Sequence, residues 1–412
     1  MKQTDSPVVV QKYGGSSVAT PARIEAIAER ISRSLRKGIR LVVVLSAMGK
    51  TTDELVELAH AVAHRPRGRE LDMLLASGEQ VSVSLLGLAL RSRGIPAVAL
   101  TGGQCGIQTD SAFNAARIES IDTTRIFSEL NRGNVVIIAG FQGVTHDQEI
   151  TTLGRGGSDI TGAAVAVALS ARVCEICTDV DGVLSADPKV VPNARKWKVI
   201  GYEEAIEMAS SGAKVLHPRA AEVCMAYDIP IHVRSSFHLR NGTWIRGSQK
   251  MKIEQAAVLG VSSDKGIAKI TLRDVPDRPG LAAEVFQSLA TEGISVRLII
   301  QSESSDARGR ITFVLDSEFV EDAKKLIRMW QDAGLTSEGI VEQDVAKISI
   351  IGSRLASTPG LAARMFSVLA RESINIDCIS SSEMKVACVI SSEHVDQAVR
   401  AVHAEFFGEV RE

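Results

Sequence analysis

The stretch VVVQKYGGSSV, residues 8 to 18, decides the fold of the first part of the chain, because an apolar run ends in a lysine and then two glycines. The apolar run predicts a buried strand. Gly14 and Gly15 let backbone N–H groups approach an anion without a Cβ atom in the way, and Ser16 adds a hydroxyl donor and can cap a helix. Lys12 would place a positive charge beside that anion. The stretch is typical of a phosphate-binding turn, although a plain tight turn gives similar strings.

The composition predicts a globular protein that binds a small ligand. The chain has 412 residues, 45% of them hydrophobic, which is enough for two or three domains with their own cores. Its 47 Lys and Arg nearly balance 49 Asp and Glu, so no overall field favours nucleic acid or an anionic membrane. The N-terminus has no basic segment followed by an apolar core, and no apolar run approaches the ~20 residues of a bilayer span. We therefore expect a cytoplasmic protein without nucleic-acid or membrane partners.

Six cysteines are too few and too scattered for a disulfide framework, so we expect buried, reduced thiols. Cys174 and Cys177 form a CxxC pair, but the surrounding residues predict a strand. Positions three apart on a strand point to opposite faces. The pair is therefore not expected to hold a metal ion.

From residue 8 to about residue 237, strand-like apolar runs alternate with longer amphipathic stretches. Examples are RLVVVL at 40–45, NVVIIA at 134–139, RVCEICT at 172–178 and IPIHVRS at 229–235, with a helical pattern over 20–35. This alternation predicts an α/β sheet. Ligands of such sheets bind beyond the carboxyl ends of the strands, which is where glycine, serine and acidic residues occur here.

The last third contains an internal repeat. Residues 279–296 match residues 359–376 at 10 of 18 positions, with an offset of 80, and AKITL at 268–272 corresponds to AKISI at 346–350. Each copy predicts a strand, a Pro-Gly entry to a helix, and further strands and a helix, which is an α+β module of ~70 residues. Two copies of one module suggest ligand sensing or pairing, and residues 241–255 form the expected junction.

Three further segments have residue types that suit an anionic substrate and a nucleotide. In GRGGSD, residues 154–159, Arg155 can grip a carboxylate with two parallel hydrogen bonds, and Asp159 can hold an ammonium group or a metal-linked water. A helix cap with a surface arginine would explain the same string.

In TDVDGVLSADP, residues 178–188, three aspartates can organise Mg²⁺ or ribose hydroxyls, or can simply form turns. In SSGAKVLHPRA, residues 210–220, Lys214 is a second candidate phosphate cation, whereas His217 is expected to be a structural hydrogen-bonding residue.

Six motifs occur together and in order: KYGGSS at 12–17, SAMG at 46–49, SGE at 77–79, GRGGSD at 154–159, TDVDG at 178–182 and SGAKVLHPR at 211–219. On these motifs the chain resembles the aspartokinase family over nearly its whole length. The resemblance implies an α/β fold: an amino-acid-kinase (carbamate-kinase-like) three-layer α/β/α domain followed by two α+β ferredoxin-like ACT domains. The limits we expect are 1–250 for the kinase domain, 264–340 for the first ACT domain and 341–412 for the second, which would include a strand from 251–263.

The resemblance also implies the activity. An aspartokinase transfers the γ-phosphoryl group of ATP to the side-chain carboxylate of L-aspartate, giving 4-phospho-L-aspartate, the first step of lysine, threonine and methionine biosynthesis. The implied cofactors are ATP and Mg²⁺, with the metal bound together with ATP and not by protein ligands alone. Lysine, threonine or both would act as effectors through the ACT domains, in a homo-oligomer or an alpha/beta assembly.

By the same resemblance, site residues fall into four groups. The catalytic residues would be Lys12, Asp159 and Lys214. The substrate-binding residues would be Ser46, Thr52, Glu79, Arg155, Gly156, Gly157, Ser158 and Asp159. The ATP-binding residues would be Lys12, Tyr13, Gly14, Gly15, Ser16, Thr178, Asp179, Asp181, Gly182, Leu184, Lys189 and Lys214. The effector-binding residues would be Asp277, Gly280, Ser295, Gln301, Asn375, Ile376, Ser382 and Glu383.

The chain departs from the family pattern in places that matter for regulation. Cys177 and Leu184 stand where the family commonly has aromatic residues near the adenine, and Arg297 stands where the first ACT domain usually has an aspartate. Reversing a charge near an effector's ammonium group leads to the hypothesis that feedback by lysine or threonine is weakened or changed in specificity. Met251 is a candidate internal start for a separate regulatory subunit.

Two alternatives remain beside an aspartokinase. One is a sister amino-acid kinase acting on another acidic amino acid, although two ACT modules argue against most sisters. The other is a catalytically inactive ACT sensor, against which five intact residues argue: Lys12, Glu79, Arg155, Asp159 and Lys214.

Overall fold

The computed structural model describes residues 6–35, 38–213, 215–247, 257–303, 308–355 and 357–408. The chain forms two compact units. Unit 1 comprises Met1–Leu184, Arg195–Ser210 and Lys214–Glu254, and unit 2 comprises Ser185–Ala194, Ser211–Ala213 and Gln255–Glu412. Two short segments of the first part of the sequence therefore belong to the same unit as the repeat.

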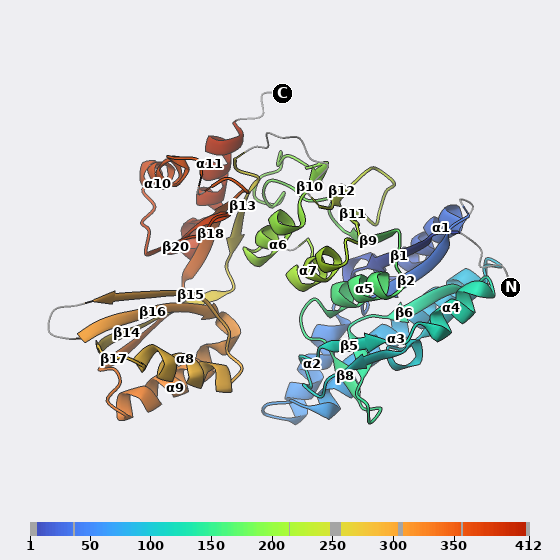
Figure 1. Ribbon diagram of the computed structural model, residues 1–412, viewed down its shortest axis with the longest axis horizontal. Helices are drawn as coiled ribbons and strands as arrows, with labels where there is room; N and C mark the ends of the chain where they lie inside the picture. Colours follow the sequence, from blue (N-terminus) through green and yellow to red (C-terminus); the bar gives the residue numbers. More distant parts are fainter. Residues whose placement is uncertain are drawn as a thin grey trace. The chain divides into compact units, whose positions relative to one another are not determined.

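Unit 1 is built on an eight-stranded sheet (Figure 1). Its strands, in spatial order, are β10 (Val199–Ile200), β12 (Thr243–Ile245), β11 (Ile231–Ser235), β9 (Val173–Thr178), β1 (Val8–Tyr13), β2 (Arg40–Leu45), β6 (Val135–Ala139) and β3 (Ala97–Leu100). The strands β11, β9, β1, β2, β6 and β3 run parallel to one another, whereas β12 is antiparallel to β11, so the carboxyl ends of these six strands lie along one edge. This edge is where the sequence places its glycine and lysine motifs.

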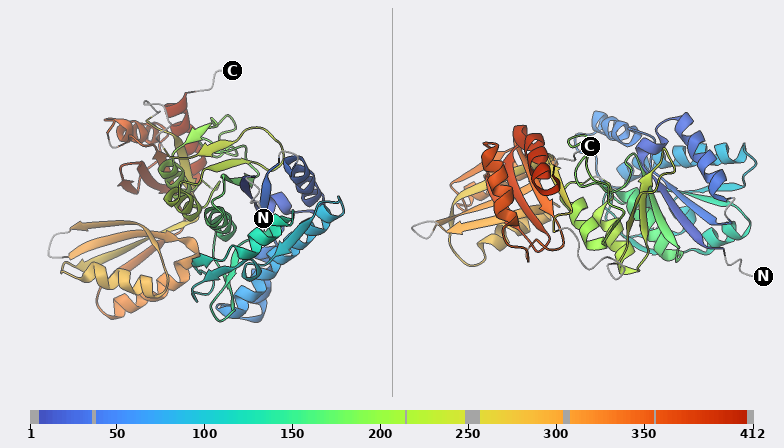
Figure 2. Two further views of the ribbon diagram at one scale, coloured as in Figure 1. Left: turned by 45° about the vertical axis from the view of Figure 1, so that its right-hand side comes forward. Right: turned by 90° about the horizontal axis from the view of Figure 1, so that it is seen from above.

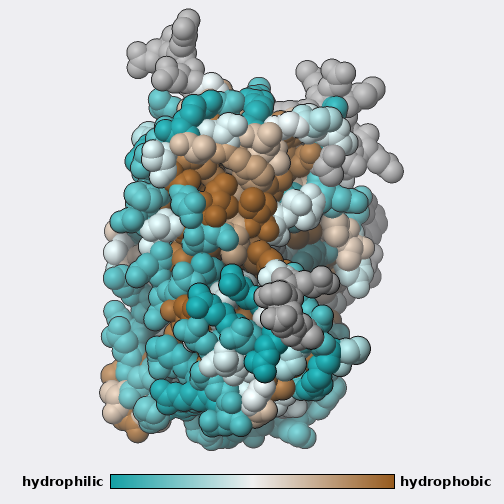
Figure 3. Space-filling model, turned by 90° about the vertical axis from the view of Figure 1, so that its left-hand side faces the viewer, coloured by the Kyte–Doolittle hydropathy of each residue, from teal (hydrophilic) through white to brown (hydrophobic). Residues whose placement is uncertain are grey.

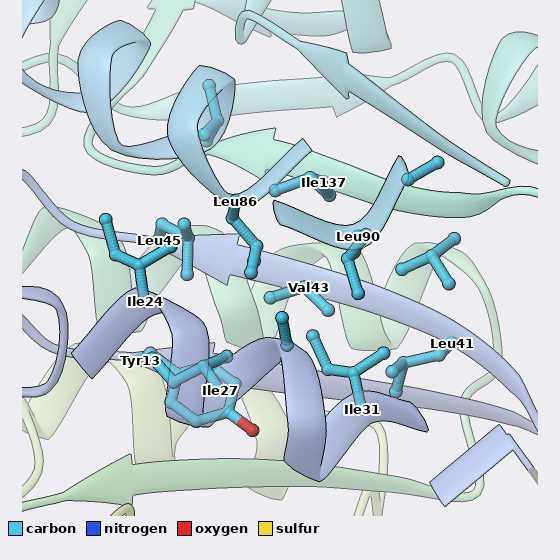
Figure 4. Close-up of a cluster of buried hydrophobic side chains, with 14 of the residues drawn as sticks. Tyr13, Ile24, Ile27, Ile31, Leu41, Val43, Leu45, Leu86, Leu90 and Ile137 are labelled. Atoms are coloured by element: carbon cyan, nitrogen blue, oxygen red, sulfur yellow. The ribbon is translucent and has the colours of Figure 1, made fainter. Parts of the chain in front are cut away.

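Helices cover both faces of this sheet (Figure 2). The helices of unit 1 are α1 (Pro21–Leu35), α2 (Thr51–Val62), α3 (Arg69–Arg91), α4 (Thr124–Asn131), α5 (Gly157–Ala168), α6 (Tyr202–Ser210) and α7 (Pro218–Ala226). On one face, α1 and α3 pack against β1, β2 and β6 (Figure 4). On the other face, α5 packs against β1, β2 and β9, and α7 packs against α5. The predicted α/β/α domain is confirmed.

The α1 face shows how the sequence specifies this layer. Ile24, Ile27 and Ile31 recur at helical spacing and are buried against alternate residues of β2, Leu41 and Val43 among them (Figure 4). Helical and strand periodicities of 3.6 and 2 residues place these side chains on facing surfaces.

A second, four-stranded sheet lies in unit 1, in the order β5 (Ile118–Ile121), β4 (Ile107–Thr109), β7 (Gln142–Val144) and β8 (Ile150–Thr152). Strand β8 packs against α3. Within the described ranges, α3 is the one helix long and apolar enough to cross a membrane, and more than half of its most apolar stretch is buried inside the protein. We interpret it as a core helix, because Leu86 and Leu90 lie in the hydrophobic core.

Unit 2 contains the two copies of the repeat. The first copy has β14 (Ile267–Pro276), α8 (Leu281–Thr291), β15 (Val296–Glu303), β16 (Arg308–Asp316), α9 (Val320–Asp332) and β17 (Glu338–Glu342). The second has β18 (Val345–Ile351), α10 (Leu361–Arg371), β19 (Cys378–Ser381), β20 (Lys385–Ser391) and α11 (Val395–Phe407), and β13 (Gly260–Asp264) pairs with β18. Each copy has a four-stranded antiparallel sheet and two helices, as predicted for ferredoxin-like modules.

The Pro-Gly pairs of the repeat mark equivalent turns. Gly280 and Gly360 precede α8 and α10 with φ of +93° and +88°, a conformation that favours glycine. The two modules share a small apolar cluster of Ile267, Leu298, Val314, Val345, Cys378 and Val389. Both copies thus enter their first helix through the same Pro-Gly turn, and both lie in unit 2.

The segment 185–194 packs on the second module. Ala186, Val190, Val191 and Ala194 contact its hydrophobic core, and the Ser185 hydroxyl lies 2.8 Å from Nε2 of His403 on α11. The expected limits of the kinase and ACT domains remain predictions.

The cysteine predictions agree with the structure. All six cysteines lie in described parts of the chain, are buried and form no disulfide. Cys177 faces the core beneath α1, whereas Cys174 interacts with Cys224 of α7 on the other face of the sheet.

Candidate active site

A pocket of about 410 Å³ opens at the carboxyl ends of the central strands of unit 1. Its lining includes residues from every predicted substrate-binding motif: Lys12, Ser46, Thr52, Glu79, Arg155, Gly156, Gly157, Ser158 and Asp159. Five residues that had not been assigned to the substrate also line it: Leu75, Asn114, Phe141, Thr152 and Gly154. Four motifs that lie far apart in the sequence therefore meet at one site.

Lys12 lies near the end of β1, with its ammonium group in the pocket. Its Nζ atom is 2.6 Å from Oδ1 of Asp159, and only about an eighth of either side chain is exposed. A Cβ atom added to Gly14 would lie 3.4 Å from this Nζ, so the glycine turn passes close to the cation. The lysine stem also passes close to Gly162 of α5. Lys12 is thus a fixed positive charge beside open backbone, as the sequence predicts.

Asp159 connects the lysine to a second loop. It stands in the first turn of α5, where a carboxylate interacts favourably with the helix dipole, and its Oδ2 accepts a hydrogen bond of 3.0 Å from the backbone N–H of His217. Burial lowers the pKa of His217, so its ring is neutral at pH 7. His217 therefore fixes the position of Asp159 through its main chain.

The GRGGSD loop depends on a glycine beside this histidine. Gly156 has φ of +71°, and a Cβ atom there would come within 2.2 Å of the His217 ring. Arg155, next to it, is exposed at the pocket. Because residue 156 has no side chain, the loop, α5 and the start of α7 can approach one another closely.

Glu79 is the most perturbed acid of the pocket. It is buried on α3, and its Oε1 accepts a 3.0 Å hydrogen bond from the backbone N–H of Ala47. Its other oxygen, Oε2, is buried and has no hydrogen-bonding partner among the described residues. Burial raises the pKa of Glu79 to about 7, against the opposing effects of the Ala47 hydrogen bond and the charge of Lys12. A carboxylate held in this way is suited to meet a cationic group of a ligand.

The predicted nucleotide residues extend along the same strand edge. Strand β9 lies beside β1, with Tyr13 opposite Cys177, and the Gly14 N–H lies 3.4 Å from the Cys177 carbonyl. Thr178 and Asp179, which come next, therefore lie near the glycine turn, and the two are joined by a 3.1 Å hydrogen bond.

The turn after β9 is fixed by two contacts. Asp181 lies 2.6 Å from Nε2 of His238, and Gly182 approaches Thr243 so closely that a Cβ atom would be 2.5 Å from its hydroxyl. Leu184 is half-buried and forms a β-bridge with Lys196.

Three predicted ATP-binding residues need separate comment. The Tyr13 side chain points into the core beneath α1 and is fully buried, so only its main chain can face a nucleotide (Figure 4). Lys189 is exposed and belongs to unit 2, where its N–H is held by Asp187 at 2.8 Å. Lys214 lies outside the described residues. The assignment of all three to ATP remains a prediction.

Four of the five residues that sequence reasoning missed lie outside every motif, and the fifth, Gly154, is part of GRGGSD but had not been assigned a role. Asn114 follows β4 and adopts φ of +68°, while Phe141 has the same φ and precedes β7. Thr152 ends β8 just before the GRGGSD loop. Thr152 and Leu75 had a usable signal, because each lies two residues before a motif, GRGGSD and SGE respectively.

The chain matches the family model described as the Amino acid kinase family over residues 7–235, and models of the ACT domain over residues 270–331 and 348–406. It is 46% identical over 401 residues to a protein named aspartokinase from Thermus thermophilus, with 97% of this chain and 98% of the relative covered. This chain belongs to the aspartokinase family. The prediction made from the six ordered motifs is therefore confirmed.

Solved aspartokinase structures agree with this assignment. The structure is similar to E. coli aspartokinase III in complex with aspartate and ADP, with a TM-score of 0.84 and 29% identity, covering 97% of this chain and 100% of that chain. It is also similar to aspartokinase III in complex with lysine and aspartate, with a TM-score of 0.73 and 28% identity, covering 97% and 99%.

The predicted effector residues of the first ACT module divide into two places. Asp277 and Gln301 line one small hollow, beside Gly309, and Gly280 lies at the start of α8. Ser295 is exposed outside this hollow.

Arg297, the departure from the usual aspartokinase pattern, is paired with acidic side chains. Its guanidinium group forms ion pairs with Asp316 at 2.6 Å and Asp264 at 3.2 Å. Its charge is therefore locally compensated, which weakens the argument that it repels an effector.

In the second module, Asn375 and Ile376 precede β19. Nδ2 of Asn375 lies 3.4 Å from Asp377, and Ile376 packs against the module's core. Ser382 and Glu383 form the exposed turn before β20. Assignment of these residues to an effector remains a prediction.

Proposed function

We propose that this chain phosphorylates the side-chain carboxylate of L-aspartate with ATP, giving 4-phospho-L-aspartate. The observation that carries the proposal is the pairing of Lys12 with Asp159 at 2.6 Å beside the Gly14 turn, in a pocket that also contains Glu79 and Arg155. The proposal is supported by the identity to named aspartokinases over nearly the whole chain and by the similarity to aspartokinase III in complex with aspartate and ADP.

The chemical problem is the repulsion between two anions. A side-chain carboxylate with pKa of ~4 is already ionised at neutral pH, so the nucleophile needs no general base. Lys12 and the backbone N–H groups of the Gly14 and Gly15 turn supply positive charge and oriented dipoles where the phosphoryl group would pass. These groups are fixed before the substrates arrive, so they need little reorganisation during the transfer.

The acceptor would be held by Arg155 and Glu79, which line the same pocket. Arg155 would bind the α-carboxylate of aspartate with its two-pronged fork. Glu79, whose Oε2 has no hydrogen-bonding partner in the described part of the chain, would accept the α-ammonium group, which restores the ionised state that burial disfavours. Ser46, Thr52 and Ser158 supply further polar contacts in the pocket.

Mg²⁺ fits this site as a metal that arrives with ATP. Over the described residues, no group of three or more His, Cys, Asp or Glu side chains is placed to hold a metal ion. Among the pocket residues, the carboxylates are Glu79 and Asp159. Mg²⁺ is commonly held by one or two carboxylates together with phosphates, and Asp159 would be its protein contact. When bound, it would neutralise part of the phosphate charge.

Regulation and location complete the proposal. Lysine and threonine are the candidate effectors of the ACT modules, and copies of the chain would assemble through exposed surfaces of these modules. Unit 2 has exposed isoleucines on β15 and β19, Ile299 and Ile379, and an apolar area is visible on the face in Figure 3. We further propose that the protein is cytoplasmic.

One assay tests the activity. The protein is incubated with ATP, Mg²⁺ and hydroxylamine, which traps an acyl phosphate as a hydroxamate, and L-aspartate is compared with L-glutamate and N-acetyl-L-glutamate. Hydroxamate from aspartate supports the proposal, hydroxamate from another acid alone assigns a sister kinase, and none from any acid indicates an inactive sensor. Adding lysine and threonine, singly and together, tests feedback, and strong concerted inhibition below ~1 mM would refute the hypothesis of weakened regulation.

A further inference from the structure

A fully buried carboxylate lies behind the pocket and is not part of any motif. Asp72 is on α3, with none of its surface exposed. It lies seven residues before Glu79 and three before Leu75, so the three side chains share one face of the helix. Leu75 and Glu79 line the pocket directly. Asp72 continues that face away from the lining.

Four donor groups from two separate segments hydrogen-bond to the Asp72 carboxylate. From Asn114 it accepts the backbone N–H at 3.1 and 2.9 Å and the side-chain Nδ2 at 2.6 Å. From Thr152 it accepts the backbone N–H at 2.9 Å and the hydroxyl at 2.5 Å. A carboxylate has about four lone-pair sites, so its acceptor capacity is filled.

Both donors belong to the pocket wall. Asn114 and Thr152 line the pocket, and Thr152 lies three residues before Arg155. Asn114 is held a second time, because its Oδ1 accepts the Gly68 N–H at 2.7 Å. A Cβ atom added to Gly154 would lie 3.2 Å from the Asn114 carbonyl, so the loop after β4 also contacts the first glycine of GRGGSD. One carboxylate therefore joins α3, the loop at Asn114 and the end of β8.

We propose that Asp72 is a positioning residue for the amino-acid acceptor. By holding Thr152, Asp72 sets the position of the loop that leads to Arg155 relative to Glu79. By holding Asn114, it fixes the neighbouring wall of the pocket. Arg155 and Glu79 would bind opposite charges of one small amino acid, so their separation determines how well the acceptor fits. Asp72 contacts neither substrate, and its effect falls on acceptor binding more than on phosphoryl transfer.

This inference rests on the proposed assignment of the pocket to aspartate. A purely stabilising role predicts a different result, because a smaller folded fraction lowers the apparent kcat and leaves the KM for both substrates unchanged.

The test is Asp72→Asn in the full-length protein. The asparagine amide has the same shape as the carboxylate, but its NH2 group would face the hydrogen-bond donors of Asn114 or Thr152. The variant therefore loses hydrogen-bond acceptors and places donor against donor. We expect the KM for aspartate to rise at least ~10-fold, with kcat within about threefold of the parent and the KM for ATP unchanged. We also expect faster hydrogen exchange at the backbone amides of Asn114 and Thr152.

Two sets of variants make the test specific. Asp110→Asn is the matched control, because Asp110 accepts backbone N–H bonds from Ala112 and Arg117 near the same loop and does not line the pocket. It should leave the KM for aspartate within about twofold of the parent. If Asp72→Asn does not fold, Thr152→Val removes one donor to Asp72 and should raise the KM for aspartate. Thr152→Ser retains the hydroxyl, so its KM for aspartate should lie closer to the parent value.

The proposal is overturned if Asp72→Asn keeps the parent KM for aspartate and the parent exchange rates, or if Asp110→Asn has the same effect. It is also overturned if the apparent kcat alone falls, or if the KM for ATP rises as much as the KM for aspartate. Failure of the parent to use aspartate would refute the proposed function instead, and the exchange measurement would still decide whether Asp72 holds the two segments.

Discussion

Replacing Lys12 with alanine should remove the main fixed charge that acts on the transferring phosphoryl group. The side chain is about an eighth exposed, and its ammonium group stands beside the Gly14 turn. At an effective dielectric constant of ~20, a unit charge ~4 Å from a developing negative charge stabilises it by about 4 kcal/mol, or roughly a thousandfold in rate. Partial solvent access reduces this value, so we expect Lys12→Ala to lower kcat by at least ~100-fold.

The hydroxamate assay at saturating ATP and aspartate measures this effect, and the KM for aspartate should change by less than about threefold. Lys50→Ala is the matched control, because Lys50 is an exposed lysine just before α2 that does not line the pocket. If Lys12→Ala retained the parent kcat and mainly raised the KM for aspartate, Lys12 would be a ground-state contact of the acceptor, and the charge argument would be wrong.

Three other changes test the structure more widely. Glu79→Gln should stabilise the protein at pH 8 but not at pH 4.5, since the raised pKa of Glu79 means that the folded state loses stability as pH rises from about 4.5 to about 7; equal Tm differences at both pH values would contradict this. Gly156→Ala should lower kcat at least ~10-fold because its Cβ would meet the His217 ring. Gly94→Ala has nearly the same φ but open space around it, so it should cost only ~1 kcal/mol of stability. Equal losses of kcat and of stability in the two variants would rule out the clash. Burial lowers the pKa of His403, so stability should fall as pH drops below ~6.5, and His403→Gln should remove that part of the fall; parallel Tm curves between pH 8 and 5 would show otherwise.

The fold was predictable because its signals are local. The parallel strands appear as short apolar runs that end in glycine, serine or aspartate, and the 80-residue offset of the repeat appears directly in the sequence. The same is true of the edge proposed to bind phosphate, since Lys12 and the glycines lie within one strand and its following turn. Local signals of this kind can be recognised without knowledge of the tertiary structure.

The rest of the site depends on contacts between distant segments, which no motif announces. The spacing of Asp72, Leu75 and Glu79 predicts that they share a helix face, but it does not predict that Asn114 and Thr152 will meet that face. Likewise, nothing local in residues 185–194 indicates that this segment packs with the second ACT module.

Arg297 shows why a substitution must be judged by its partners. From sequence, an arginine at a usual aspartate position suggests a reversed charge near an effector. In the structure, two carboxylates, Asp264 and Asp316, already neutralise it, and the hollow lined by Asp277 and Gln301 does not include it. An ion pair that is about a third exposed contributes little stability, but it directs the guanidinium group to one place. We therefore predict that any effect of Arg297 on regulation would act through β13 and β16, the strands that its partners terminate, and not through direct repulsion of a bound amino acid.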